Sequence, residues 1–121
     1  MDALLVAEAL SHAITTQNVA GIQALYTDET VTWRSYDRAE HGCADTIEFF
    51  KAFFEKAEEI RYSDIRRVRT DEGYVQQHVI HTTLKDGSRF DPRPVCILAK
   101  VVNGKVLRID EYIEARRLAS Q

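Results

Sequence analysis

The sequence predicts one α+β domain in which three N-terminal helices pack on the concave face of a curved, mostly antiparallel sheet. Three observations predict it. Apolar residues recur with helical spacing up to about residue 58, and beyond that point their spacing is that of strands. Asp-Gly and Asn-Gly turn signals divide the second half into hairpins. The 121 residues contain no linker or repeat, so we expect a single domain over residues 1–121, a cone-like α+β barrel that encloses a pocket.

Helical stripes mark three segments before residue 58. The first places Ala3, Ala7, Leu10 and Ile14 on one face, with Asp2 positioned to cap its N-terminus. The second is a short stripe from 19 to 26. The third is expected to begin at a capping box at 45–48. Its four phenylalanines lie on more than one side, which indicates packing against a broad surface: Phe49, Phe50, Phe53 and Phe54.

Strands are expected at 30–36 and at four later segments, which are 59–70, 74–84, 89–102 and 105–115. Asp86-Gly87 and Asn103-Gly104 mark two of the turns, because two-residue hairpin turns need positive φ. Pro92 and Pro94 predict a bulge or a sheet edge near the start of the 89–102 strand, since proline cannot donate to the ladder.

Composition and charge exclude several classes of protein. Apolar residues make up 45% and charged residues 29%, which is typical of globular domains and not of disordered chains. A net charge of −3 argues against a nucleic-acid partner. No apolar run is long enough to span a membrane. The first residues lack a basic secretory segment, so we expect a cytoplasmic location with Cys43 and Cys96 as free thiols.

Glu111 is the leading candidate for chemistry. Two-residue alternation on the last strand places it on one face with Leu107, Ile109 and Ile113. A carboxylate on an apolar face is costly unless it is paired or lines a cavity, and burial raises its pKa toward the range used in general acid/base catalysis. The alternatives are a glutamate satisfied by an arginine across the sheet, or one that a bulge places outside the pocket.

Arg34 and the histidines at 78 and 81 are the other candidates. Arg34 shares one face of the first strand with Thr32, where it can pair with Glu111 or hold an anionic oxygen; the alternative is an exposed arginine at the rim. His78 and His81 lie three residues apart on a strand, so they point to opposite faces and cannot bind one metal.

Three segments resemble the nuclear-transport-factor-like superfamily, and within it the SnoaL-like polyketide cyclases. They are residues 18–31, Gly42 before the third helix, and residues 103–114, where Asn-Gly-Lys leads to a tyrosine and acidic residues. The resemblance implies a homodimer that binds a small molecule in a cone-shaped cavity. It also implies that Glu111 stands where the cyclases have an Asp that acts as general acid/base.

The sequence departs from the related enzymes at other positions. Ketosteroid isomerase has a catalytic Tyr, an Asp and a second acid where this chain has Leu10, Arg34 and Cys96. The Arg and Asp of limonene epoxide hydrolase fall near Gln77 and Val79. Mapping that hydrolase's strand onto this chain places Gln77 and His81 inward, so His81 is preferred to His78.

We therefore expect a cofactor-independent acid/base enzyme of the cyclase, isomerase, dehydratase or epoxide-hydrolase type, acting on a largely apolar molecule. The chain has no Gly-rich phosphate loop and no metal-ligand spacing, so neither cofactor nor metal is expected. The alternatives are a non-catalytic binding module and a dimeric interaction module that uses the outer face of the sheet. The expected catalytic residues are Glu111, Arg34 and His81, and the expected pocket lining is Tyr26, Thr32, Phe50, Phe54, Gln77, Cys96 and Ile109.

Overall fold

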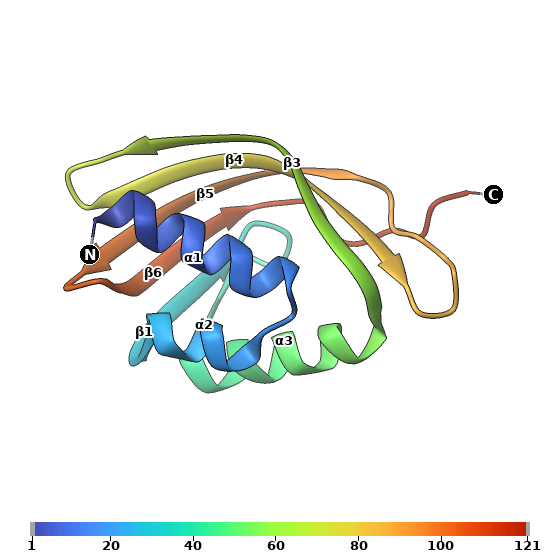
Figure 1. The fold of residues 1–121 in the computed structure, drawn as a ribbon, viewed down its shortest axis with the longest axis horizontal. Coiled ribbons are helices and arrows are strands. Elements are labelled where there is room, and N and C mark those ends of the chain that lie inside the picture. The colour runs from blue at the N-terminus through green and yellow to red at the C-terminus, as the bar shows by residue number, and fades with distance from the viewer. Residues whose placement is uncertain (1, 121) are drawn as a thin grey trace.

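Three helices cover the concave face of a curved, open six-stranded sheet in the computed structural model, which describes residues 2–120 (Figure 1). The predicted α+β class and the helices on the concave face are confirmed. In chain order the elements are α1 (Ala3–Thr15), α2 (Val19–Leu25), β1 (Tyr26–Arg34), β2 (Ala39–His41), α3 (Cys43–Lys56), β3 (Ala57–Arg69), β4 (Gly73–Leu84), β5 (Arg93–Val102) and β6 (Lys105–Tyr112).

Side-chain caps fix where the first two helices begin. The Asp2 carboxylate accepts a hydrogen bond from the Leu4 amide at 3.0 Å, as predicted. Asn18 does the same for the Gly21 amide at the start of α2. Helix α3 begins at Cys43, after Gly42, with no side-chain cap. The capping box predicted at 45–48 is therefore wrong, and Asp45 instead lies in the first turn, where its charge suits the helix dipole.

The strands lie in the order β2-β1-β6-β5-β4-β3. Strands β3 to β6 form the predicted antiparallel meander, whereas β1 pairs with β6 in parallel. Strand β1 begins at Tyr26, earlier than predicted, and β5 begins at Arg93, later than predicted. Pro94 lies at the start of β5, beyond the point where Tyr112 of β6 pairs with Cys96, so its missing N–H breaks no ladder bond to β6.

The core lies between the helices and the concave face. Its fully buried apolar residues include Val6 of α1, Ile22 of α2 and Tyr74 of β4. A register shift between Lys100 and Val101 interrupts the alternation on β6. As a result Val106 is buried in place of the expected Leu107.

Two further sequence expectations can be compared with the structure. Cys43 and Cys96 are free thiols, as predicted. Within residues 2–120, every helix is too short or too polar to cross a membrane.

Gly73 is required where β4 meets β5. A Cβ on Gly73 would lie 2.2 Å from the carbonyl oxygen of Ala99, and its other near neighbours, the carbonyl carbon of Ala99 and the amide nitrogen of Val101, are also backbone atoms that cannot rotate away. We predict that Gly73→Ala lowers the free energy of unfolding by about 2 kcal/mol or more in urea titrations followed by circular dichroism. Gly42→Ala is the matched control, since a Cβ there meets nothing within 4 Å. Equal stability of the two variants would contradict the prediction.

Candidate functional site

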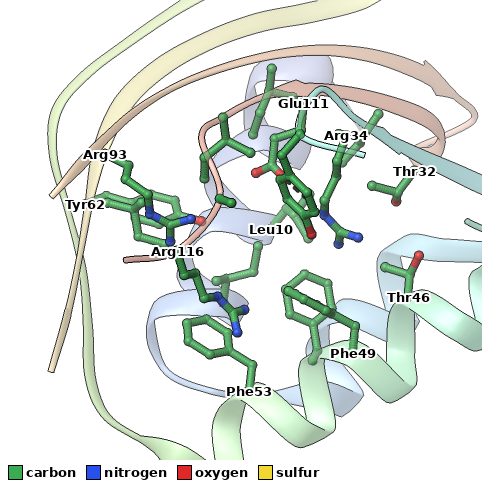
Figure 2. A pocket seen from close by; sticks show the side chains of 18 of the residues that line it. Leu10, Thr32, Arg34, Thr46, Phe49, Phe53, Tyr62, Arg93, Glu111 and Arg116 are labelled. Atoms are coloured by element: carbon green, nitrogen blue, oxygen red, sulfur yellow. Dashed lines mark hydrogen bonds and ion pairs between the residues drawn. The ribbon is translucent and has the colours of Figure 1, made fainter. Parts of the chain in front are cut away.

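A cavity of about 280 Å³ lies between the concave face of the sheet, helices α1 and α3, and the segment that follows β6 (Figure 2). Most of its wall is apolar, and this part comprises Leu10, Ile14, Phe49, Phe50, Phe53, Ile80, Ile97, Ile109, Ile113 and Ala115. The polar part comprises Tyr26, Thr32, Arg34, Tyr36, Thr46, Tyr62, Arg93, Glu111 and Arg116. An apolar wall with a few converging polar groups is typical of a small-molecule site.

Arg34 and Glu111 form an ion pair at the top of this cavity. They are direct neighbours in the parallel pairing of β1 with β6, so their side chains leave the same face of the sheet. Arg34 Nε donates to Glu111 Oε1 at 3.2 Å. The Arg34 guanidinium also lies over the Phe49 ring, with 4.3 Å from Cζ to the ring centroid. The structure thus brings together the two sequence candidates whose contact the sequence left open.

Ser35 holds the backbone around Glu111. Its amide donates to the carbonyl of Glu111 at 2.9 Å. Its hydroxyl donates to the carbonyl of Ile113 at 3.0 Å and accepts from the amide of Ile113 at 2.9 Å. These bonds extend the β1–β6 pairing past the last residue of β1, so the Glu111 side chain projects from a fixed backbone.

Burial raises the pKa of Glu111 above that of an ordinary glutamate, and the nearby guanidiniums of Arg34, Arg93 and Arg116 oppose this shift. The burial effect is the larger of the two. The side chain keeps 23% of its surface accessible, so it is still open to a molecule in the cavity. A raised pKa moves a carboxyl group toward the range that suits general acid/base chemistry.

Arg93 and Arg116 are site residues that the sequence analysis missed. Arg93 is the first residue of β5 and alternates inward with Val95 and Ile97, and it is only 5% exposed. Arg93, like Glu111, is a charged residue on an apolar strand face. The sequence analysis did not recognise this pattern because it placed the start of the strand at residue 89 and not at Arg93. Arg116 lies after the last strand, where no periodicity exists to place it.

The segment after β6 folds back along residues 89–91 and so brings Arg116 to the cavity. The Asp91 amide donates to the Arg117 carbonyl and the Ala119 amide to the Arg89 carbonyl, both at 2.8 Å. The Arg116 guanidinium then lies over the rings of Phe53 and Phe49, at 4.2 and 4.8 Å from their centroids. Figure 2 shows Arg116 beside Phe53 and Phe49.

Several buried polar atoms of the cavity wall have no partner. Within residues 2–120, four buried side-chain nitrogen or oxygen atoms lack a hydrogen bond, and three belong to cavity residues: Thr32 Oγ1, Thr46 Oγ1 and Arg93 Nε. An unpaired buried polar atom is destabilising. A ligand that supplies the missing partners would therefore gain binding energy from atoms already in place.

Tyr26 and Tyr62 add two phenol groups to the wall. Burial is the main cause of the raised pKa of each phenol, and the negative charge of Glu111 contributes to both shifts. Both phenols therefore remain protonated and can donate hydrogen bonds. The Tyr62 ring stacks on His78, with 3.8 Å between the ring centroids.

The expected inward orientation of Gln77 and His81 is wrong. Gln76, His78 and Ile80 of β4 are buried, whereas Gln77 is exposed and His81 hydrogen-bonds to Ser63 Oγ at 2.8 Å. Cys96 is the cross-strand partner of Gln77, so it faces the same outer side of the sheet. Gln77 and Cys96 lie in a shallow groove on that outer side, and neither they nor His81 line the cavity.

A buried polar network explains which face of β4 turns inward. Gln76 contacts Ser11 at 3.2 Å, Arg67 at 2.8 Å and the Nδ1 of His78 at 3.0 Å. Because each polar group has a partner, Gln76 and His78 can be buried on the inner face. Burial, helped by the charge of Arg67, lowers the pKa of His78 to about 4, so this histidine is neutral.

Of the five remaining residues that were expected to line the cavity, four do so. Tyr26, Thr32, Phe50 and Ile109 line the cavity, whereas Phe54 is buried in the core beside Phe50 and does not. Within residues 2–120, no cluster of three or more His, Cys, Asp or Glu side chains has an arrangement that would hold a metal ion.

The sequence model of the SnoaL-like domain matches residues 7–109, so this chain belongs to the SnoaL-like family. No significant match was found among curated proteins.

Solved structures of related proteins share the fold. A provisionally assigned SnoaL-like polyketide cyclase from Shewanella denitrificans has a TM-score of 0.81 and 13% identity, with 93% of this chain and 90% of that one covered. A provisionally assigned polyketide cyclase from Pseudomonas putida has a TM-score of 0.79 and 16% identity, with coverage of 93% and 91%. A protein with a ketosteroid isomerase-like fold from Catenulispora acidiphila, in complex with trimethylamine, has a TM-score of 0.76 and 13% identity, with coverage of 90% and 85%. At these identities the likeness is one of fold.

Arg34 opposes the upward shift of the Glu111 pKa, which leads to a pH prediction. In Arg34→Gln the pKa of Glu111 should rise above its wild-type value, because burial is unchanged and the nearest positive charge is gone. The measurement is a ¹³C NMR titration of the Glu111 carboxyl carbon, assigned with Glu111→Gln. Arg108→Gln is the control, since Arg108 pairs with Glu40 and Asp110 and does not line the cavity. A Glu111 pKa that falls or stays constant in Arg34→Gln would contradict the prediction.

Proposed function

We propose that this SnoaL-like protein is a cofactor-independent enzyme in which Glu111 transfers a proton to or from a small, largely apolar substrate. The observation that carries the proposal is the Glu111 carboxyl group, with its raised pKa, in a cavity of ligand size whose wall is mostly apolar. The resemblance of residues 103–114 to the SnoaL-like cyclases also supports the proposal, because it implies that Glu111 stands where they have an Asp that acts as general acid/base.

The proposed reaction begins with removal of a proton from a carbon next to a substrate carbonyl. Glu111 accepts the proton, and the electron pair of the C–H bond becomes an enolate. Arg34 supports this step, because its Nε orients the carboxylate and its terminal nitrogens make no hydrogen bond within residues 2–120. Those nitrogens can donate to the enolate oxygen, as can the hydroxyl of Thr32 or Thr46.

The second step determines the class of reaction. Return of the proton to a different atom gives an isomerisation, and attack of the enolate carbon on a second carbonyl gives a cyclisation, in which Glu111 returns the proton to the new alkoxide. Two structural relatives carry the name polyketide cyclase provisionally, so aromatic polyketides are the first compounds to test. Terpene epoxides and steroids are the next compounds to test, because the wider superfamily includes limonene epoxide hydrolase and ketosteroid isomerase.

The test is a turnover screen of these compounds by mass spectrometry and by proton–deuterium exchange in D₂O. Glu111→Gln should lower kcat/KM by about 100-fold or more while the protein stays folded, because the proton acceptor is lost. Asp110→Asn is the matched control: it removes the neighbouring carboxylate, which faces the other side of β6 and bonds to Arg108. Full activity of Glu111→Gln toward a compound that the wild type converts would overturn the proposal.

A non-catalytic binding module is the second candidate. The observation that favours it is the Arg34–Glu111 ion pair, because a carboxylate with a structural partner can be buried there without a catalytic role. In the same screen this candidate predicts compounds that raise the melting temperature, exchange no deuterium and are recovered unchanged.

We also propose that the protein forms a homodimer through the outer face of the sheet. Apolar side chains are exposed there, among them Leu98, which is 44% exposed, and Tyr112, which is 50% exposed. The Tyr112 ring packs against the Trp33 ring, with 5.2 Å between the ring centroids. Sedimentation at micromolar concentration should give the mass of a dimer, and Leu98→Glu should shift it toward the monomer because a charge is then placed in the interface. Sedimentation of the wild type as a monomer would refute the dimer.

A further inference from the structure

The cavity contains more positive charge than its one carboxylate can balance. Three arginines line it, and Glu111 is the only acidic residue among the lining residues. Arg34 is the arginine that hydrogen-bonds to Glu111. Within residues 2–120, neither Arg93 nor Arg116 forms an ion pair.

Both remaining guanidiniums have unused hydrogen-bonding groups. Arg93 is 5% exposed and donates one bond, from Nη1 to the carbonyl of Glu114 at 2.9 Å, while its Nε has no partner. Arg116 makes no side-chain hydrogen bond within residues 2–120 and is held by aromatic rings alone.

The two guanidiniums lie on the same side of the cavity (Figure 2). Burial is the main cause of the lowered pKa of each guanidinium, and the positive charge of Arg93 contributes to the lowered pKa of Arg116. The phenol of Tyr36 acts in the opposite direction on the pKa of both guanidiniums. Figure 2 shows Arg93 and Arg116 on one side of the cavity, with Arg34 and Glu111 on the other.

We infer that the ligand of this cavity is an apolar-bodied carboxylic acid, whose carboxylate binds between Arg93 and Arg116 and whose body extends along the apolar wall toward Glu111. This inference rests on the proposed function in that the cavity is taken as the ligand site. It adds an anionic end to the largely apolar ligand proposed above. Arginine pairs with carboxylates through two parallel hydrogen bonds, which is the geometry that the free donors of Arg93 and Arg116 can supply.

A carboxylate fits this site better than a phosphate. Arginine binds phosphate as well as carboxylate, but many phosphate sites add several backbone N–H groups from a glycine-rich loop or a helix N-terminus. The cavity lining contains no glycine. The donors available are side chains, and Arg93 already spends one donor on Glu114.

The test compares 2-naphthoate with its uncharged analogue 2-naphthamide by calorimetry. The acid should bind at least about tenfold more tightly than the amide, because charge-assisted hydrogen bonds are the stronger ones. 2-Naphthyl phosphate is the third probe. Equal affinity of acid and amide, absence of binding by the acid at millimolar concentration, or tighter binding of the phosphate than of the acid would each overturn the inference.

Variants at the two arginines locate the anionic end. Arg116→Gln should weaken naphthoate binding about tenfold or more and leave naphthamide binding unchanged, and Arg93→Gln should act in the same direction. Arg116 lies outside the sheet, so its variant tests the inference even where Arg93→Gln does not fold. Arg117→Gln is the matched control, because Arg117 bonds through its backbone carbonyl and does not line the cavity. Equal loss of acid and amide binding in Arg116→Gln would count against a carboxylate site.

Glu111→Gln separates this inference from the proposed enzymatic function. Naphthoate should bind to Glu111→Gln at least as tightly as to the wild type, because removal of a negative charge favours an anion in the cavity. Turnover of a substrate, in contrast, should be lost. Retained turnover with charge-dependent binding would overturn the catalytic role of Glu111 alone, whereas lost turnover with charge-independent binding would overturn the carboxylate site alone.

Discussion

The parallel pairing of β1 with β6 is the constraint on which the rest of the site depends. It sets Arg34 and Glu111 side by side on the concave face, although 77 positions separate them in the chain. An acid buried against apolar residues would be unfavourable alone, and the adjacent guanidinium offsets part of that cost. Ser35 then extends the same pairing by three hydrogen bonds, so the site is fixed by backbone as well as by charge.

The sequence predicted the elements more securely than the direction in which they face. Alternation separates His78 from His81 on β4, but both sides of this strand carry polar residues, so alternation alone does not identify the inner side. That choice depends on Ser11 of α1 and Arg67 of β3, which satisfy Gln76 and His78 once they are buried. Partners so distant in sequence cannot be inferred from the local pattern of residues 74–84. Glu111 was placed correctly because its neighbours Ile109 and Ile113 leave one face clearly apolar.

The electrostatic character of the cavity changes the view of what it binds. The sequence suggested an apolar pocket with one acid, because its aromatic and aliphatic residues are easy to recognise. Arg93 and Arg116 come from the start of a strand and from the segment after the last strand, which are the places where periodicity is weakest. The three guanidiniums also limit how far burial can raise the pKa of Glu111, so the same charges serve the acid and the ligand.

The segment that carries Arg116 gives the cavity a wall of low local stability. Within residues 2–120, only two backbone hydrogen bonds, which together form an isolated antiparallel bridge between Phe90 and Leu118, attach it to residues 89–91. Such a segment opens by fraying while the sheet and helices stay folded. Opening of this segment would widen access to the cavity without unfolding the sheet or the helices. The segment can also accept substitutions at little cost to the core, so the charge at this end of the cavity can change during evolution independently of the fold that holds Glu111.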